Sequence, residues 1–569
     1  MLSPRYIFLL LLLPAVVLSS CSDDILNTEA RSAFAEDLVY SDPSQAEGLV
    51  FTAYNSTESW GINRQQWWGR RFNIEGASFE AKFNFRDLDQ FRMRAGLTPS
   101  NSGIFNQKWD QYWTYVRLCN EFLDNIDDSP AMDMDPERVN VLKAEMRFLR
   151  ANLYSKLIRL YGGVPIIDRA LGLEDDFDLA RNSYEECVDF IVTELDEAAA
   201  ILPESRPDAE FGRATKLAAM AVKSRVLLYA ASKLHDPATI PNGPLYDYAK
   251  SSKWQDAADA AKELIDMVGS RALISVNNAK DYQDLFLSPN EDILFARPFS
   301  PEFYDFGTDA NSLWDKTMPP NGFDGWGLSS PTHNFTLQFN MADGSNTTDG
   351  TFDPANPNDN REMRYYANLL FNGAEFRGRK IEYYLSEDPD TYPHGLDSPE
   401  GLGNPLHSSK TGYNIRKFQD ELVDVNGGIS PMRPYILYRL AEVYLNYAEA
   451  MYHVGNEAEA RQYLNMVSSR ALQPEITASG DDLLEAIKRE RRVELCFEGH
   501  NFFDERRWME EDKLGFDIRG LRWTMQTDGN LSFEEYTVVT RPYFEKHYYL
   551  PIPRTEIEKA PAVLQNHGY

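Results

Sequence analysis

Cysteine and histidine are both scarce in this chain of 569 residues, which has four of the first and eight of the second. No two cysteines stand in a CxxC arrangement, and the sequence contains no HExxH motif, P-loop or GxSxG motif. It therefore offers no residues to assign to a zinc site or a nucleophilic catalyst. Cys119, Cys187 and Cys496 fall within apolar helical patterns, so we expect buried free thiols there and no disulfide framework.

Positive charge is also in short supply. The chain has 57 Lys and Arg residues against 88 Asp and Glu residues, which gives a net charge of −31 at pH 7. Nucleic acid requires a basic binding face, and anionic lipid headgroups attract basic segments. We therefore expect no nucleic-acid partner and no electrostatic docking on a membrane.

The longest apolar run covers residues 6–18 and has 13 residues. A membrane-spanning helix needs roughly 20, so the run is too short to be one. Arg5 precedes the run and two serines follow it, which is the pattern of a signal peptide. Residues 18–21, Leu-Ser-Ser-Cys, resemble a bacterial lipobox, in which the cysteine is acylated and becomes the new N-terminus. We predict a lipoprotein signal peptide at residues 1–20 and a palmitate-type lipid anchor at Cys21, with an ordinary secretory signal as the alternative.

Helical periodicity dominates the first half and the last quarter of the chain. Asp135 and Pro136 form a helix start, Gly162 a stop, and Ser183 with Glu186 a capping box. The apolar spacing predicts helices over residues 136–160, 184–202, 215–232 and 253–267. Residues 434–454 and 457–471 are expected to form a helical hairpin similar to one tetratricopeptide unit, although a 34-residue period does not persist.

The stretch from about residue 271 to residue 429 has a different composition. It is rich in Asn, Asp, Gly and Pro, and its helical period is lost. Short strands are expected at residues 293–297 and 380–385. The predicted fold class is mainly α, a tetratricopeptide-like helical-repeat scaffold with a large irregular, loop-rich insertion face. The predicted divisions are the signal peptide, an N-terminal helical region at 21–232, and a C-terminal region at 233–569 that includes the insertion at about 271–429.

Several segments stand in a characteristic order behind the lipobox: residues 109–126, 144–151, 160–166, 438–450, 490–500, 503–508, 550–553 and 565–569. Together they resemble the SusD/RagB family of outer-membrane nutrient-binding lipoproteins of the Bacteroidetes. Asn501, Glu505 and His567 depart from the family pattern, which usually has a basic residue, Leu and Pro at these positions.

The resemblance implies a protein that binds nutrient glycan and delivers it to a SusC-like TonB-dependent transporter. It also implies a lipid-anchored protein on the outer membrane that faces the cell exterior, and Asp23 and Asp24 resemble the export tag of such proteins. No enzyme activity and no cofactor are expected. A peptide-binding member of the same family, a surface glycoside hydrolase and a purely structural surface protein are the alternatives.

Two groups of residues have spacings that are compatible with a catalytic or a metal site. Glu490, Glu494 and Glu498 follow one another at intervals of four, so two of them could form an acid/base pair. The neighbouring cations favour an ion-pair network with Arg506 and Arg507 instead. His500 and Asp504 have the spacing of metal ligands, but no second histidine lies near them. We therefore predict no catalytic residue and no metal site.

The predicted ligand site depends on aromatic residues in polar loops, because sugars present apolar C–H faces and polar edges. Trp109, Trp113, Trp254 and Trp508 lie in helical patterns and are expected in the core. A neutral glycan is favoured by the negative net charge, although a cluster of arginines around Arg70 leaves an acidic glycan open. Two regions qualify, residues 60–85 and 314–339, and the predicted ligand-binding residues are Trp60, Trp67, Trp68, Trp314, Asn321 and Trp326.

The lipid anchor gives the first testable prediction. Replacement Cys21→Ala removes the acylated thiol, so the protein should leave the membrane fraction and appear in soluble form. Fractionation of cells that express the variant, with Cys119→Ala as the matched control, measures this. Quantitative retention of the Cys21→Ala protein in the outer membrane would contradict the prediction.

Overall fold

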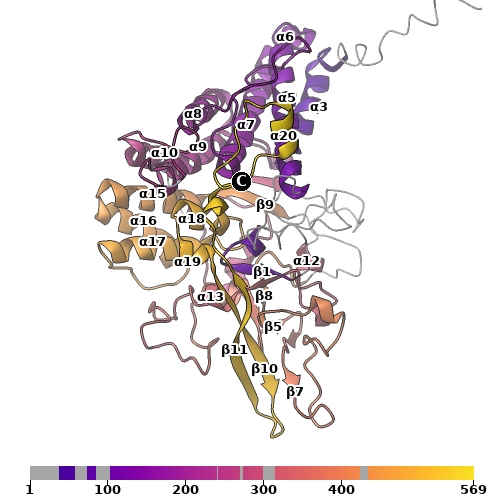
Figure 1. Cartoon of the computed structure of the whole chain (residues 1–569), viewed down its shortest axis with the longest axis vertical. Coiled ribbons are helices and arrows are strands. Elements are labelled where there is room, and N and C mark those ends of the chain that lie inside the picture. The colour runs from indigo at the N-terminus through magenta and orange to yellow at the C-terminus, as the bar shows by residue number, and fades with distance from the viewer. Residues whose placement is uncertain are drawn as a thin grey trace, which may run out of the picture.

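The computed structural model describes residues 38–57, 74–84, 103–239, 241–269, 273–298, 314–422 and 433–569. Long helices gather in one half of the molecule, while short helices, short strands and loops make up the other half (Figure 1). The chain is mainly helical with a loop-rich face, as its sequence predicts. Within the described part of the chain, no helix is long and apolar enough to cross a membrane.

The N-terminal helices pack on one another mostly in chain order. The contacts run from α5 to α7, α8, α9 and α10, and α10 also packs on a later helix, α15. Their shared core contains Leu149, Leu157 and Ile191. The helices are α3 (Pro43–Tyr54), α5 (Gly103–Asn125), α6 (Pro130–Met134), α7 (Pro136–Tyr161), α8 (Tyr184–Ile201), α9 (Lys216–Ala231) and α10 (Lys253–Val268).

Capping residues set the ends of these helices at the positions that the sequence predicts. The Asp135 carboxylate accepts the Arg138 N–H at 3.0 Å at the start of α7, and Gly162 ends it with φ 77°. The capping box of Ser183 and Glu186 is formed at the start of α8. The four predicted N-terminal helices are confirmed to within two residues at their ends because their signals are local.

The predicted C-terminal hairpin is confirmed in part. Helix α15 (Leu440–Val454) packs antiparallel on α16 (Glu457–Arg470) around Gly455, which has φ 94°. Residues 434–439, however, were wrongly assigned to the first helix. They form strand β9 (Pro434–Arg439), which pairs antiparallel with β2 (Ile293–Pro298). Pairing with this distant strand satisfies backbone groups that a helix would have bonded locally. The prediction of a strand at 293–297 is confirmed.

The remaining C-terminal helices are α17 (Asp481–Glu494), α18 (Asn501–Arg507), α19 (Glu511–Leu514) and α20 (Arg554–Lys559). Helix α17 packs on α15 and α16 and so extends the helical half. Cys119, Cys187 and Cys496 are buried free thiols, as predicted. Burial raises the pKa of Cys119 and Cys187 to about 12, so both stay protonated.

The loop-rich half has a second core around Phe335, Phe339 and Tyr365. Its short helices are α11 (Ala279–Asp284), α12 (Trp314–Thr317), α13 (His333–Thr336) and α14 (Met363–Asn368). Its strands form three antiparallel pairs, which are β1 (Ala81–Phe83) with β3 (Ser329–Pro331), β4 (Leu369–Phe371) with β8 (Tyr413–Ile415), and β5 (Glu375–Phe376) with β6 (Arg379–Lys380). The strand predicted over 380–385 is found only at its two ends, in β6 and in β7 (Leu385–Ser386).

The longest strands of the described chain lie in the last quarter of the sequence, for which helical structure is predicted, so that prediction is wrong for these residues. Strands β10 (Phe516–Met525) and β11 (Leu531–Arg541) form an antiparallel hairpin that projects from the loop-rich half (Figure 1). Trp523 lies opposite Phe533, with ring centroids 4.8 Å apart. Asp528 and Gly529 stand in the turn, and Gly529 has φ 83°. An Asp-Gly pair between strand-forming residues is a hairpin signal, so this element could have been predicted.

Two glycines with positive φ provide a prediction on stability. A Cβ on Gly162 would lie 2.7 Å from the Leu245 carbonyl oxygen, whereas a Cβ on Gly455 would meet nothing within 4 Å. Replacement Gly455→Ala should lower the free energy of unfolding by about 1 kcal/mol, from backbone strain alone. Replacement Gly162→Ala should lower it by about 3 kcal/mol, because strain and a clash with backbone combine. Urea unfolding followed by circular dichroism measures both, and equal losses would contradict the expectation.

Candidate functional site

The two predicted ligand regions meet in the structure. Strand β1, from the end of residues 60–85, pairs with β3, from within residues 314–339, with Ala81 opposite Pro331 and Phe83 opposite Ser329. Asn84 donates from Nδ2 to Ser330 Oγ at 2.6 Å, and Thr332 donates its N–H to the Glu80 carbonyl at 3.0 Å. These bonds join segments that lie about 250 residues apart in sequence. Trp60, Trp67 and Trp68 lie outside the described residues.

Trp326 is half-buried in the loop that leads into β3. Its backbone N–H donates to the Lys316 carbonyl at 3.1 Å, and its ring centroid lies 6.2 Å from that of His407 at an interplanar angle of 45°. The ammonium of Lys316 pairs with Asp324 at 2.5 Å. An aromatic ring with part of its surface exposed among polar groups has the chemistry that a sugar ring requires.

Trp314 does not have the exposed position that was expected of it. The residue is only 8% exposed and belongs to the second core. Its indole N–H donates to the Lys417 carbonyl at 2.9 Å, and its ring packs edge-on to Phe418 at 5.5 Å. The sequence could not show this, because Lys417 and Phe418 are about 100 residues away along the chain.

Asn321 is also buried, at 1% exposure. Its side-chain amide donates to the carbonyls of Ser398 at 3.0 Å and Leu402 at 2.8 Å. It therefore joins two loops of the insertion instead of lying in a surface loop as expected. The assignment of Trp314 and Asn321 to the ligand site stays a prediction, since no ligand contact has been tested.

The four tryptophans expected in the core follow two patterns. Trp109 and Trp508 are buried, as predicted, whereas Trp113 and Trp254 are half-buried. Trp254 stacks on His453, with ring centroids 3.8 Å apart. Trp109 and Trp113 also line a cavity of about 370 Å³ between α5, α20 and the loop at residues 165–179. The sequence does not predict this cavity, and the spacing of the two tryptophans is the one sequence feature that could have indicated it.

Glu490, Glu494 and Glu498, the three glutamates considered for an acid/base pair, lie in a buried ion-pair network. Helix α17 ends at Glu494, and Phe497 has φ 60°, so Glu498 is not on the same helix as the other two. Glu490 pairs with Arg364 at 2.6 Å, and Glu498 pairs with Lys417 at 2.7 Å. Glu494 pairs with three arginines, Arg364, Arg439 and Arg470. Burial raises the pKa of Glu494, but these charges outweigh it and hold the pKa well below its usual range.

The network itself was expected, but its partners were predicted wrongly. Arg506 pairs with Glu505 and Arg507 pairs with Glu449 and Asp504, so neither reaches the three glutamates. Asp504 also accepts from Arg491 at 2.8 Å, which commits both of its oxygens. Across the described ranges, no group of three or more His, Cys, Asp or Glu residues could hold a metal ion.

Comparison with known proteins accords with this architecture. The family model described as "SusD family" matches residues 291–569, and the one described as "Starch-binding associating with outer membrane" matches residues 69–228. The chain belongs to the SusD family. SusD-like protein P25 of Formosa agariphila is 25% identical over 483 residues, which cover 81% of this chain and 79% of that protein. A SusD-like protein of Bacteroides ovatus is 24% identical over 562 residues, which cover 95% and 91%.

Solved structures of SusD-like proteins superpose over nearly the whole chain. A SusD-like protein from Bacteroides fragilis has a TM-score of 0.77 and 27% identity, and the match covers 93% of this chain and 98% of that one. A SusD-like carbohydrate binding protein from the same species has a TM-score of 0.74, 24% identity and coverage of 92% and 99%. A laminarin binding SusD-like protein has a TM-score of 0.66 and 19% identity, and covers 93% and 100%. The last two likenesses show the shared fold.

Two departures from the SusD/RagB pattern contact the residues that lead into β1. Asn501 donates from Nδ2 to Glu80 Oε2 at 2.8 Å, and Glu505 Oε2 accepts the Phe79 N–H at 2.9 Å. The structure places both against the segment that anchors one of the two candidate ligand regions.

The buried Glu80 gives a prediction on pH. Burial raises its pKa from about 4.5 to about 8, although the Phe497 N–H and the Asn501 amide oppose the shift. The folded state therefore retains a proton that the unfolded state loses, so this group lowers stability as pH rises from about 5 to about 8, by up to about 1.4 kcal/mol per unit. Replacement Glu80→Gln, which resembles the protonated acid, should reduce that slope.

Urea unfolding at a series of pH values measures the slope of stability against pH. The control is Glu534→Gln, because Glu534 is exposed on the projecting hairpin and, within the described ranges, its one ion pair is with the exposed Arg522. Glu505 has a pKa raised by burial to about 7 and contributes a slope of the same sign, so the slope should be reduced and not abolished. An unchanged slope in Glu80→Gln would mean that Glu80 is ionised in the folded protein.

Proposed function

We propose that this SusD-family protein binds a nutrient glycan at the cell surface and delivers it to a SusC-like TonB-dependent transporter. The convergence of residues 60–85 and 314–339 at the β1–β3 pair carries the proposal. Both regions combine aromatic residues with polar loop residues, which is the pattern expected of sugar-binding loops. Their connection on a rigid scaffold would allow aromatic rings from both to contact one ligand.

The available contacts suit capture followed by release. Two aromatic stacks add about 0.5–1.5 kcal/mol each beyond area burial, and each exposed hydrogen bond adds about 1 kcal/mol. Together these contacts correspond to dissociation constants of roughly millimolar to micromolar. A polymeric ligand that makes several such contacts is retained through its higher effective concentration.

The proposed location is the outer face of the outer membrane, with the body of the protein held by lipid on Cys21. The lipobox supports the anchor, Asp23 and Asp24 support the outward orientation, and the family model for outer-membrane-associated starch-binding proteins supports the membrane. Family membership supports the transporter partner. Co-purification from detergent-solubilised membranes tests it, and a preparation without any outer-membrane barrel would count against delivery.

The proposed ligand class rests on the net charge of this chain and on the ligands that similar proteins are described as binding. A net charge of −31 disfavours strongly anionic polymers, so a neutral glycan is proposed. Similar structures include proteins described as carbohydrate binding and laminarin binding. A peptide ligand is the alternative from the same family. A glycoside hydrolase is the alternative from another class, and it would release reducing ends from a polysaccharide.

Calorimetry with neutral glycans such as laminarin and starch, with acidic glycans and with oligopeptides distinguishes these ligands. Replacements Trp326→Ala and Trp68→Ala should each weaken binding of the active ligand about tenfold, which corresponds to the loss of one aromatic stack. Trp254→Ala is the matched control, since Trp254 is also half-buried but belongs to helix α10 in the helical half (Figure 1). Wild-type affinity in both test variants would overturn the site, and release of reducing ends would overturn the binding-only function.

A further inference from the structure

Arg159 is an unusual cation in the helical half. It lies in the last turn of α7, where its guanidinium stacks 3.7 Å above the Phe503 ring. Among the described residues, Arg159 has no hydrogen bond and no ion pair, and its Nε is fully shielded without an acceptor. Stacking on an aromatic ring compensates only part of the hydration free energy that a guanidinium loses when it is withdrawn from water.

Neighbouring buried arginines meet carboxylates. Arg225 makes a bidentate contact with Glu442, with donor–acceptor distances of 2.5 and 2.6 Å. Arg491 pairs with Asp504, and Arg507 pairs with Glu449. Arg159 is on the same core, but no carboxylate among the described residues pairs with it. Burial lowers its pKa, in keeping with an uncompensated charge.

Two small cavities lie against Arg159. One has a volume of about 30 Å³ and is also lined by Asn152, Lys156, Tyr438, Glu498 and His500. The second has about 20 Å³ and is also lined by Tyr184 and Tyr229, and both include Arg225. Roughly 10–15 Å³ is enough for a particle the size of a water molecule. The first cavity therefore has room for one or two such particles.

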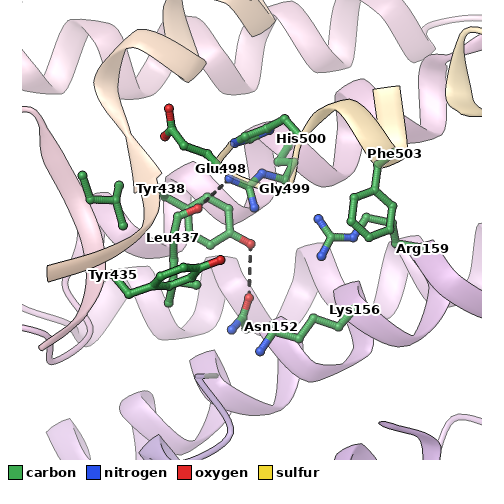
Figure 2. A pocket seen from close by; sticks show the side chains of 12 residues that line it. Asn152, Lys156, Arg159, Tyr435, Leu437, Tyr438, Glu498, Gly499, His500 and Phe503 are labelled. Carbon is green, nitrogen blue, oxygen red and sulfur yellow. Dashed lines mark hydrogen bonds between the residues drawn. The ribbon is translucent and has the colours of Figure 1, made fainter. Parts of the chain in front are cut away.

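Donors outnumber free acceptors around these cavities. Figure 2 shows Arg159 and Lys156 reaching in from α7, with His500 and Glu498 on the opposite wall. The Glu498 carboxylate is already held by Arg439 and Lys417, and the Asn152 Oδ1 accepts the Tyr438 hydroxyl at 3.2 Å (Figure 2). The hydroxyl of Tyr229 lines the second cavity and has no partner among the described residues.

We propose that Arg159 and its cavities form a binding site for a monatomic anion such as chloride, which compensates the charge of this half-buried side chain. Arg159 supplies the charge and N–H donors, and Tyr229 supplies an O–H donor. A water molecule would satisfy these donors but would leave the charge uncompensated, so the anion is the better occupant. The site would join α7, α9 and the chain before α18, all elements of the scaffold.

Anomalous diffraction gives the direct test. Crystals of the protein soaked in sodium bromide should show an anomalous peak beside the Arg159 guanidinium, because bromide replaces chloride and scatters anomalously. The same data on crystals soaked in sodium gluconate should show none. A bromide-soaked crystal that shows peaks only at the surface, or none, would overturn the proposal and leave water as the occupant.

Thermal unfolding gives an independent test. Raising chloride from about 5 to about 150 mM, with gluconate keeping the ionic strength constant, should raise the Tm by about 1–3 °C. Arg159→Met should abolish this response. Arg147→Met is the control on the same helix, because Arg147 pairs with Glu194 at 2.7 Å and Glu197 at 2.6 Å, and it should retain the response. A wild-type Tm independent of chloride would overturn the proposal even if the Arg159 variant does not fold.

Discussion

The carboxylate of Glu494 holds the two halves of the molecule together. Its Oε1 accepts from Arg439 of β9 at 2.7 Å and from Arg470 of α16, and its Oε2 accepts from Arg364 of α14 at 3.1 Å. Helix α16 belongs to the helical half and α14 to the loop-rich half. Removing ions from water costs several kcal/mol for each ion, so the arrangement is favourable only when every member is present. Loss of one member would leave a buried charge without compensation at the junction.

The loop-rich face depends on this junction through Lys417. The Lys417 ammonium donates to the Glu494 carbonyl at 3.1 Å and to the Glu498 carboxylate at 2.7 Å, while its own carbonyl accepts the Trp314 indole N–H at 2.9 Å. Trp314 thus connects helix α12 to the ion-pair network. A binding surface built of long loops loses affinity if its loops must be ordered when the ligand arrives. The buried contacts of Trp314 and Asn321 reduce that cost, which gives both residues a structural role in the face.

Charge compensation differs between this junction and the surroundings of Arg159. In the junction, carboxylates and cations are matched within hydrogen-bond distance, and Glu494 alone meets three arginines. Around Arg159, three residues before Gly162, the described chain supplies a ring face and donors. The Glu498 carboxylate, which lines the same cavity, is already held by Arg439 and Lys417. A charge withdrawn from water requires a counter-charge. The junction supplies one from its own residues, whereas the described residues around Arg159 do not.

The sequence by itself determined the features that local contacts decide. Helices α7 and α8 begin and end at caps a few residues away, and the two aromatic loop regions were recognisable from composition. Tertiary structure decided the rest. Residues 434–439 became strand β9 because β2 offers a partner about 140 residues away, and the ion-pair partners of Glu494 come from distant elements. Whether Trp314 and Asn321 lie outside or inside depended on carbonyls about 80 to 100 residues along the chain. Burial and pairing between distant residues are properties of the packed chain, which no local pattern contains.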